Sequence, residues 1–98
     1  MKIPEKLDIG GVTYRFRTDE QAFLNRQNLN GQTRFEELDI CLSTTIHPEK
    51  RMHTFWHETL HAIDEEYCGS KAMTEDATDA IASGLLQVLK QLGVTLEE

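Results

Sequence analysis

The sequence His57-Glu58-Thr59-Leu60-His61 lies inside a stretch with helical periodicity, and this stretch organises the rest of the chain. The stretch opens with Pro48-Glu49, which suits a helix start because proline fits the first helical position and acids stabilise the first turn. Apolar residues then recur at helical spacing and form a core stripe: Met52, Phe55, Trp56, Leu60 and Ile63. We therefore expect a helix from about Pro48 to Tyr67.

His57 and His61 stand four residues apart, so they share one helix face, beside the apolar stripe rather than on it. Two imidazoles in that arrangement can both reach one Zn²⁺ at about 2.0–2.1 Å per Zn–N bond. Glu58 follows the first histidine and is placed to act as a general base on a water bound to the metal. The alternative is a structural or solvent-facing histidine pair. We expect a metal site, because buried core histidines would lie on the stripe.

A catalytic zinc site usually has a third protein ligand and leaves one position for water. No further histidine follows the motif, so acids at the start of a final helix are the candidates. At about 100° per residue, Glu75 lies nearest the edge of that helix's apolar stripe, Asp79 lies further out, and Asp76 lies roughly opposite. We predict Glu75 as the third ligand and Asp79 as the next candidate. An alternative role for Glu75 is that of a first-turn acid that stabilises the helix dipole.

Other side chains near the motif are less directly tied to metal binding. Asp64 falls between the two histidines in angle, so it either accepts a hydrogen bond from a ligand imidazole or is an exposed acid. His53 shares the histidine face and is expected on the substrate side or in solvent. Cys41 and Cys68 lack the spacing of a metal-ligand pair, so we expect two buried free thiols instead of a disulfide.

The segments before the motif predict a small sheet. Leu7 to Arg17 alternates apolar and polar residues around Gly10-Gly11, which is typical of a β-hairpin. Leu38 to Leu42 alternates in the same way and is expected to form another strand, and Gln32 to Phe35 is a candidate short strand. Asp19 to Leu24 fits either a helical turn or a loop.

A final helix is expected after Gly69, which caps the end of the motif helix. Thr74 is a good N-cap for it, and Gly93 is expected to end it. Its apolar stripe comprises Thr78, Ile81, Ala82, Leu85, Val88, Leu89 and Leu92. Gly84 inside this helix costs about 1 kcal/mol relative to alanine, which predicts close packing against a neighbour.

Composition narrows the class of protein. With 98 residues, an apolar content of 39% and two prolines, the chain fits a single small globular domain over residues 1–98. The net charge of −7 argues against a nucleic-acid-associated protein, because binding a phosphate backbone needs a basic surface. Neither a signal peptide nor a transmembrane run is evident, so no membrane role is expected and a reducing cytoplasm is the expected compartment.

Three segments carry a resemblance to a known family: Phe55-Trp56-His57-Glu58-Thr59-Leu60-His61-Ala62-Ile63-Asp64, Met73-Thr74-Glu75-Asp76 and Ala82-Ser83-Gly84-Leu85-Leu86-Gln87-Val88-Leu89. They resemble small phage and prophage metallopeptidase-like proteins, relatives of the ImmA/IrrE-type and SprT-type zinc peptidases. The resemblance implies an α+β, minimal zincin-like fold of gluzincin type, with a small antiparallel sheet packed on a motif helix and a ligand helix. It implies Zn²⁺ on His57, His61 and an acid of the last helix, with Glu58 catalytic. The Glu-Ala-Asn type run of the ImmA branch is absent, so the resemblance does not fix which acid is the ligand.

We therefore predict a zinc-dependent metallopeptidase that hydrolyses a protein or peptide substrate in a bacterial host or phage-infected cell. The strand from Leu38 to Leu42 is expected at the sheet edge beside the cleft, where it can pair with an extended substrate. The alternative is a non-catalytic, zinc-stabilised protein-binding module. An open coordination position favours the enzyme, whereas a fourth protein ligand such as Cys68 favours the module.

Overall fold

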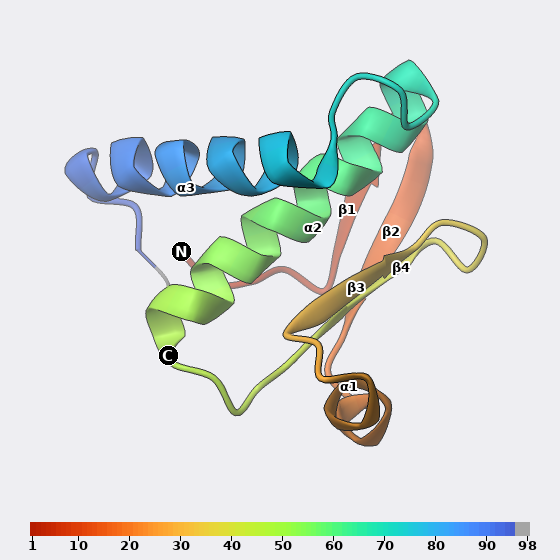
Figure 1. The fold of residues 1–98 in the computed structure, drawn as a ribbon, viewed down its shortest axis with the longest axis horizontal. Coiled ribbons are helices and arrows are strands. Elements are labelled where there is room, and N and C mark those ends of the chain that lie inside the picture. The colour runs from red at the N-terminus through yellow and green to blue at the C-terminus, as the bar shows by residue number, and fades with distance from the viewer. Residues whose placement is uncertain (96–98) are drawn as a thin grey trace.

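The computed structural model describes residues 1–95, which form one sheet and three helices (Figure 1). The strands are β1 (Lys6–Ile9), β2 (Val12–Arg17), β3 (Gly31–Arg34) and β4 (Asp39–Leu42), and the helices are α1 (Gln21–Gln27), α2 (Pro48–Cys68) and α3 (Glu75–Gln91). The motif helix α2 contacts both the sheet and α3, so it occupies the middle of the structure. The expected α+β class is confirmed.

The expected hairpin is formed by β1 and β2, which pair antiparallel. The turn residues Gly10 and Gly11 have φ angles of 62° and 88°, in the left-handed region that glycine adopts readily. Gly10 is also required by space, because a Cβ there would lie 2.5 Å from the Cβ of Glu66 on α2. Tyr14 of β2 donates a hydrogen bond from its hydroxyl to Glu66 Oε2 at 2.5 Å. The hairpin therefore packs closely against the end of α2.

The sheet has the strand order β1-β2-β4-β3 and is mixed, so the expected antiparallel sheet is wrong. β4 pairs with β2 in parallel and with β3 antiparallel. The chain leaves β2 through α1, returns as β3, and then inserts β4 between β3 and β2 (Figure 1). Alternation within a strand indicates which residues share a face, but it does not indicate which strand lies beside which.

The position of β4 corrects a second expectation, that Leu38–Leu42 forms the sheet edge beside the cleft. All four residues of β4 are buried, and the strand has a neighbour on each side. Ile40 packs in the core with Tyr14 and Phe55, all at most 1% exposed. The edge strand near α2 is instead β3, whose one pairing partner within residues 1–95 is β4.

The motif helix α2 ends within one residue of the expected position. His47 is its N-cap and accepts a hydrogen bond at Nδ1 from the Glu49 N–H at 3.2 Å, and Gly69 ends it with a φ of 61°. Because the sheet and α3 cover different sides of α2, its buried residues are not confined to the predicted stripe: they are Met52, Thr54, Phe55, Glu58, Thr59, Ala62 and Asp64. Ile63, which belongs to the predicted stripe, is 37% exposed.

The last helix, α3, runs back along α2 in the opposite direction, because Glu75 at its start meets His61 and Lys90 near its end meets Glu49. Thr74 caps it as expected, since its Oγ1 accepts a hydrogen bond from the Ala77 N–H at 3.1 Å. The helix ends at Gln91, two residues before the glycine that was expected to end it.

The packing of α3 is looser than its apolar stripe predicts. Thr78 and Ala82 are buried, whereas Ile81, Val88 and Leu92 are exposed. The prediction that Gly84 packs closely against a neighbour is wrong, because it lies on the solvent side and an added Cβ would meet no atom of residues 1–95 within 4 Å. Among residues 1–95, no helix combines the length and the apolar character needed to cross a lipid bilayer.

Candidate metal centre

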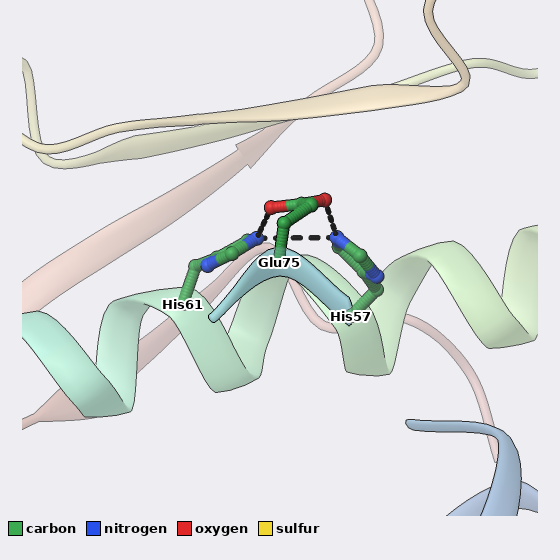
Figure 2. Close-up of side chains that lie close together, drawn as sticks. All are labelled: His57, His61 and Glu75. Atoms are coloured by element: carbon green, nitrogen blue, oxygen red, sulfur yellow. Dashed lines mark hydrogen bonds and ion pairs between the residues drawn. The ribbon is translucent and has the colours of Figure 1, made fainter. Parts of the chain in front are cut away.

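His57 and His61 of α2 and Glu75, the first residue of α3, converge on one point (Figure 2). The Nε2 atoms of the two histidines lie 3.1 Å apart. Glu75 places Oε1 2.7 Å from His57 Nε2 and Oε2 2.9 Å from His61 Nε2. The side chain of Glu75 is 70% exposed and that of His57 is 13% exposed, so the group opens to solvent on the Glu75 side. The structure thus brings together all three residues predicted as metal ligands.

Glu75 is held in place by the turn between α2 and α3. The carboxylate of Asp64, 3% exposed, accepts hydrogen bonds from the N–H groups of Ala72 at 3.0 Å and Met73 at 3.2 Å. These bonds fix the segment that leads into Thr74 and the start of α3. Both sequence-based roles of Asp64 are therefore wrong: it neither contacts a ligand imidazole nor faces solvent.

Asp79, the second candidate ligand, lies one turn after Glu75 and faces the other nitrogen of His57. Its Oδ1 is 3.3 Å from His57 Nδ1 and 3.5 Å from His53 Nε2. A carboxylate that accepts the Nδ1 proton leaves Nε2 free to bind a metal, which is the usual outer partner of a ligand histidine. Asp76 is exposed and does not belong to the cluster, as its helical phase predicts. His53 also lies within 3.2 Å of Ser83 Oγ.

Glu58 is buried directly beside the cluster, against β3. Its side chain is 7% exposed, and the Thr33 hydroxyl lies 2.9 Å from its main-chain oxygen and 3.2 Å from Oε1. Gly31 makes this approach possible, because a Cβ there would lie 2.6 Å from Thr54 Cγ2 and 3.3 Å from Glu58 Cγ. Burial raises the pKa of the Glu58 carboxyl, while His57, His61 and the Thr33 hydrogen bond oppose that rise.

Three of these contacts escape sequence analysis. Thr33 belongs to a segment that the sequence identifies only as a candidate strand, Gln32 to Phe35, and Gly31 precedes that segment. Neither residue carries a sequence signal that it touches the motif helix. The position of Asp79 is different, because its spacing of four residues from Glu75 places both on one face of α3. That spacing could have assigned Asp79 to the outer nitrogen of a histidine once Glu75 was taken as the ligand.

The two cysteines lie outside the cluster and both are free. Cys41 is buried in β4, as expected, and burial raises the pKa of its thiol. Cys68 is exposed at the end of α2, so the expectation of a buried thiol is wrong there. Cys68 is the last residue of α2, where few other elements pack against the helix. Apolar residues nearby in the sequence therefore did not predict its exposure. Cys68 therefore does not supply a fourth donor to the histidine pair.

The donor set fits Zn²⁺. With bonds of about 2.0–2.1 Å in a tetrahedron, donor atoms lie roughly 3.3 Å apart. The two Nε2 atoms, 3.1 Å apart, are within about 0.2 Å of that value, and each of them has one of the two Glu75 oxygens within 3 Å. Two imidazoles and a carboxylate are also ligands that zinc commonly takes. Comparisons of the chain with family models, curated proteins and solved structures found no match.

Proposed function

We propose that this chain is a zinc-dependent metallopeptidase in which His57, His61 and Glu75 bind the metal and Glu58 is the general base. The observation that carries the proposal is the convergence of three donors from two helices beside a buried carboxylate that does not itself belong to the ligand group. The resemblance to zinc peptidases of the ImmA/IrrE and SprT types agrees with this assignment.

The chemistry divides between the metal and the side chains. Bound Zn²⁺ would act as a Lewis acid, lowering the pKa of a water to about 7 and polarising a carbonyl oxygen. Glu58 would take the proton of the attacking water as the new carbon–oxygen bond forms, and give it to the amide nitrogen as the carbon–nitrogen bond breaks. The Thr33 hydroxyl, 3.2 Å from Glu58 Oε1, would orient that carboxylate. Asp79 would hold His57 through its Nδ1, 3.3 Å away.

The edge strand β3 offers a place for the substrate chain. It pairs with β4 on one side only, so the other side presents backbone groups to which an extended peptide can add as a further strand. Thr33 and Gly31 of β3 lie against Glu58, which places that free edge beside the cluster. We therefore assign the pairing with an extended substrate to Gly31–Arg34, in place of Leu38–Leu42.

A second candidate function is structural, because the ligands come from two helices and a bound zinc would cross-link α2 to α3. In that case the metal stabilises a protein-binding module and hydrolyses nothing. The two functions differ in what Glu58 contributes. A catalytic site needs Glu58 as a base, whereas a structural zinc site does not require a base beside its ligands.

The function is tested by incubating the zinc-loaded protein with a proteome-derived peptide mixture and identifying new termini by mass spectrometry. The matched variant is Glu58→Gln, which keeps the volume and the hydrogen-bonding capacity but cannot take a proton. We expect equal zinc content and a fall in cleavage of at least about 10²–10⁴-fold. Zinc retention with no cleavage by either protein would establish the structural candidate instead.

The ligand set is tested by a pair of neighbouring acids. Glu75→Ala is expected to weaken zinc binding strongly, whereas Asp76→Ala, one residue further on and exposed, is expected to leave it unchanged. Zinc affinity is measured by competition with a chromogenic chelator. Equal affinities in the two variants would contradict the assignment of Glu75.

A further inference from the structure

Two cavities of different character meet at the candidate metal centre. One, of about 300 Å³, extends past His61, and the other, of about 210 Å³, extends past His57. Both are lined by Gly31, Glu58 and Glu75, so they open from the same point on either side of the cluster. We call them the His61 cavity and the His57 cavity.

The His61 cavity has two large apolar side chains in its lining. Leu29, which precedes β3, and Phe35, which follows it, both line this cavity. They are 38% and 37% exposed, although each is a large apolar side chain. These two side chains, one before and one after β3, leave apolar surface in water that a ligand side chain would cover.

The His57 cavity is polar. Besides the shared residues it is lined by Asn30, His53 and Asp79. The Asp79 carboxylate is 60% exposed, and within residues 1–95 both of its polar contacts, to His57 and His53, are made through Oδ1. A cationic side chain entering this cavity would meet that carboxylate. The net charge of −7 would also attract basic peptides over a longer range.

An extended peptide can use both cavities at once. Successive side chains of a strand point to opposite faces, so the two residues that flank a scissile bond point in opposite directions. With the bond at the metal and the chain along the edge of β3, one flanking side chain would enter the His61 cavity and the other would enter the His57 cavity.

From this arrangement we infer the class of substrate, an inference that rests on the proposed peptidase function. The site selects an extended peptide with a large apolar side chain on one side of the scissile bond and a lysine or arginine on the other. Leu29 and Phe35 determine the first preference, and Asp79 determines the second.

The test measures binding of hydroxamate-terminated dipeptides to the zinc-loaded protein by calorimetry, so it does not require turnover. Two series carry the hydroxamate at the N-terminal or the C-terminal end, and therefore place their side chains on opposite sides of the metal. In one series we expect leucine or phenylalanine to bind about 10-fold more tightly than alanine. In the other we expect lysine to bind about 3-fold more tightly than norleucine, which has similar length but no charge.

Variants assign each preference to its cavity. Leu29→Ser with Phe35→Ser is expected to reduce the apolar preference to less than about 3-fold. Val88→Ser, at an exposed apolar residue on α3 outside both cavities, is expected to leave it intact. Asp79→Asn is expected to abolish the lysine preference, and Asp76→Asn is expected to retain it. Each comparison is a ratio between two ligands of one variant, so a general change in zinc affinity cancels.

The inference is overturned if both series show the same preference, if neither shows one, or if the Val88 and Asp76 variants change the ratios as much as their counterparts do. Failure of the peptidase proposal looks different. A protein that binds zinc and shows both preferences, yet cleaves no peptide carrying them, has the inferred peptide selectivity without the catalytic step. A protein that binds no zinc contradicts both.

Discussion

Among single residues, Asp39 is a buried acid that pairs with two arginines. It is buried in β4, and its two oxygens accept hydrogen bonds from Arg34 at 2.7 and 2.5 Å and from Arg17 at 3.3 Å. The hydrogen bonds from Arg34 hold the pKa of the Asp39 carboxyl below its ordinary value. A carboxyl with a lowered folded-state pKa stabilises the fold fully above its unfolded pKa, near 3.9, and loses that contribution as the pH falls through the folded value.

We predict that Asp39→Asn lowers the free energy of unfolding at pH 7 by about 1–3 kcal/mol, because the two arginines lose a buried charged acceptor. Urea denaturation at pH 7 and at pH 3 checks this prediction. The difference from wild type should shrink at the lower pH, because pH 3 lies below the unfolded pKa and the unfolded carboxyl then binds a proton more readily than the native one. A loss of stability that is the same at both values would show that the charge of Asp39 is not what matters.

Residue-scale predictions from the sequence succeed where one helix determines the outcome. The shared face of His57 and His61, and the phase of Glu75 relative to Asp76, follow from the helical repeat and agree with the structure. Asp64 shows where this reasoning fails. Its partners are main-chain N–H groups eight and nine residues later, in a turn whose path depends on how α3 packs.

At the scale of elements, the contact between β3 and α2 determines the geometry of the site. Gly31 allows the two to approach so closely that an added Cβ would overlap Thr54 and press on Glu58. We predict that Gly31→Ala costs about 1–3 kcal/mol of stability, as overpacking typically does, and displaces Glu58. Thermal or chemical denaturation measures the first effect, and the rate of peptide cleavage measures the second.

Gly84→Ala is the matched control for that substitution. The residue lies in α3 with open space where the Cβ would be, so replacing it should stabilise the protein by up to about 1 kcal/mol through helix propensity alone. Destabilisation of similar size by both substitutions would contradict the argument from space.

The turn between α2 and α3 makes another prediction at this scale. Asp64→Ala removes the acceptor for two N–H groups and should cost about 1–2 kcal/mol. Because the same turn positions Glu75, zinc affinity should fall as well, which chelator competition can measure. Asp76→Ala serves as the control, and zinc affinity in Asp64→Ala equal to that of the control would show that Glu75 finds its place without the turn.

Most elements, though not their arrangement, could be predicted from the sequence. Local signals identify the hairpin, α2 and α3: Gly10-Gly11, the proline at the first position of the motif helix and the Thr74 cap. The parallel pairing of β4 with β2 has no local signal, since it results from a crossover through α1 and β3. The same crossover makes β3 the edge strand, which is why the expected substrate strand was wrong.

At the scale of the whole molecule, the proposed ligands come from two helices, so metal binding would make stability depend on zinc. A zinc ion that binds only the folded chain stabilises it by about 2.7 kcal/mol when free zinc is 100 times the dissociation constant. For a chain of 98 residues this corresponds to roughly 10–20 °C in melting temperature. We predict a shift of that size between zinc and a chelator, and none in the variant that carries both His57→Ala and His61→Ala. A shift of equal size in this variant would place the metal elsewhere.

The central claim is the identity of the metal ligands, and X-ray absorption at the zinc K edge tests it most directly. We predict a first shell of nitrogen and oxygen atoms only, at about 2.0–2.1 Å, with the imidazole signature of two histidines and a change in the shell on Glu75→Ala. A sulfur ligand at about 2.3 Å, or a spectrum that Glu75→Ala leaves unaltered, would contradict it.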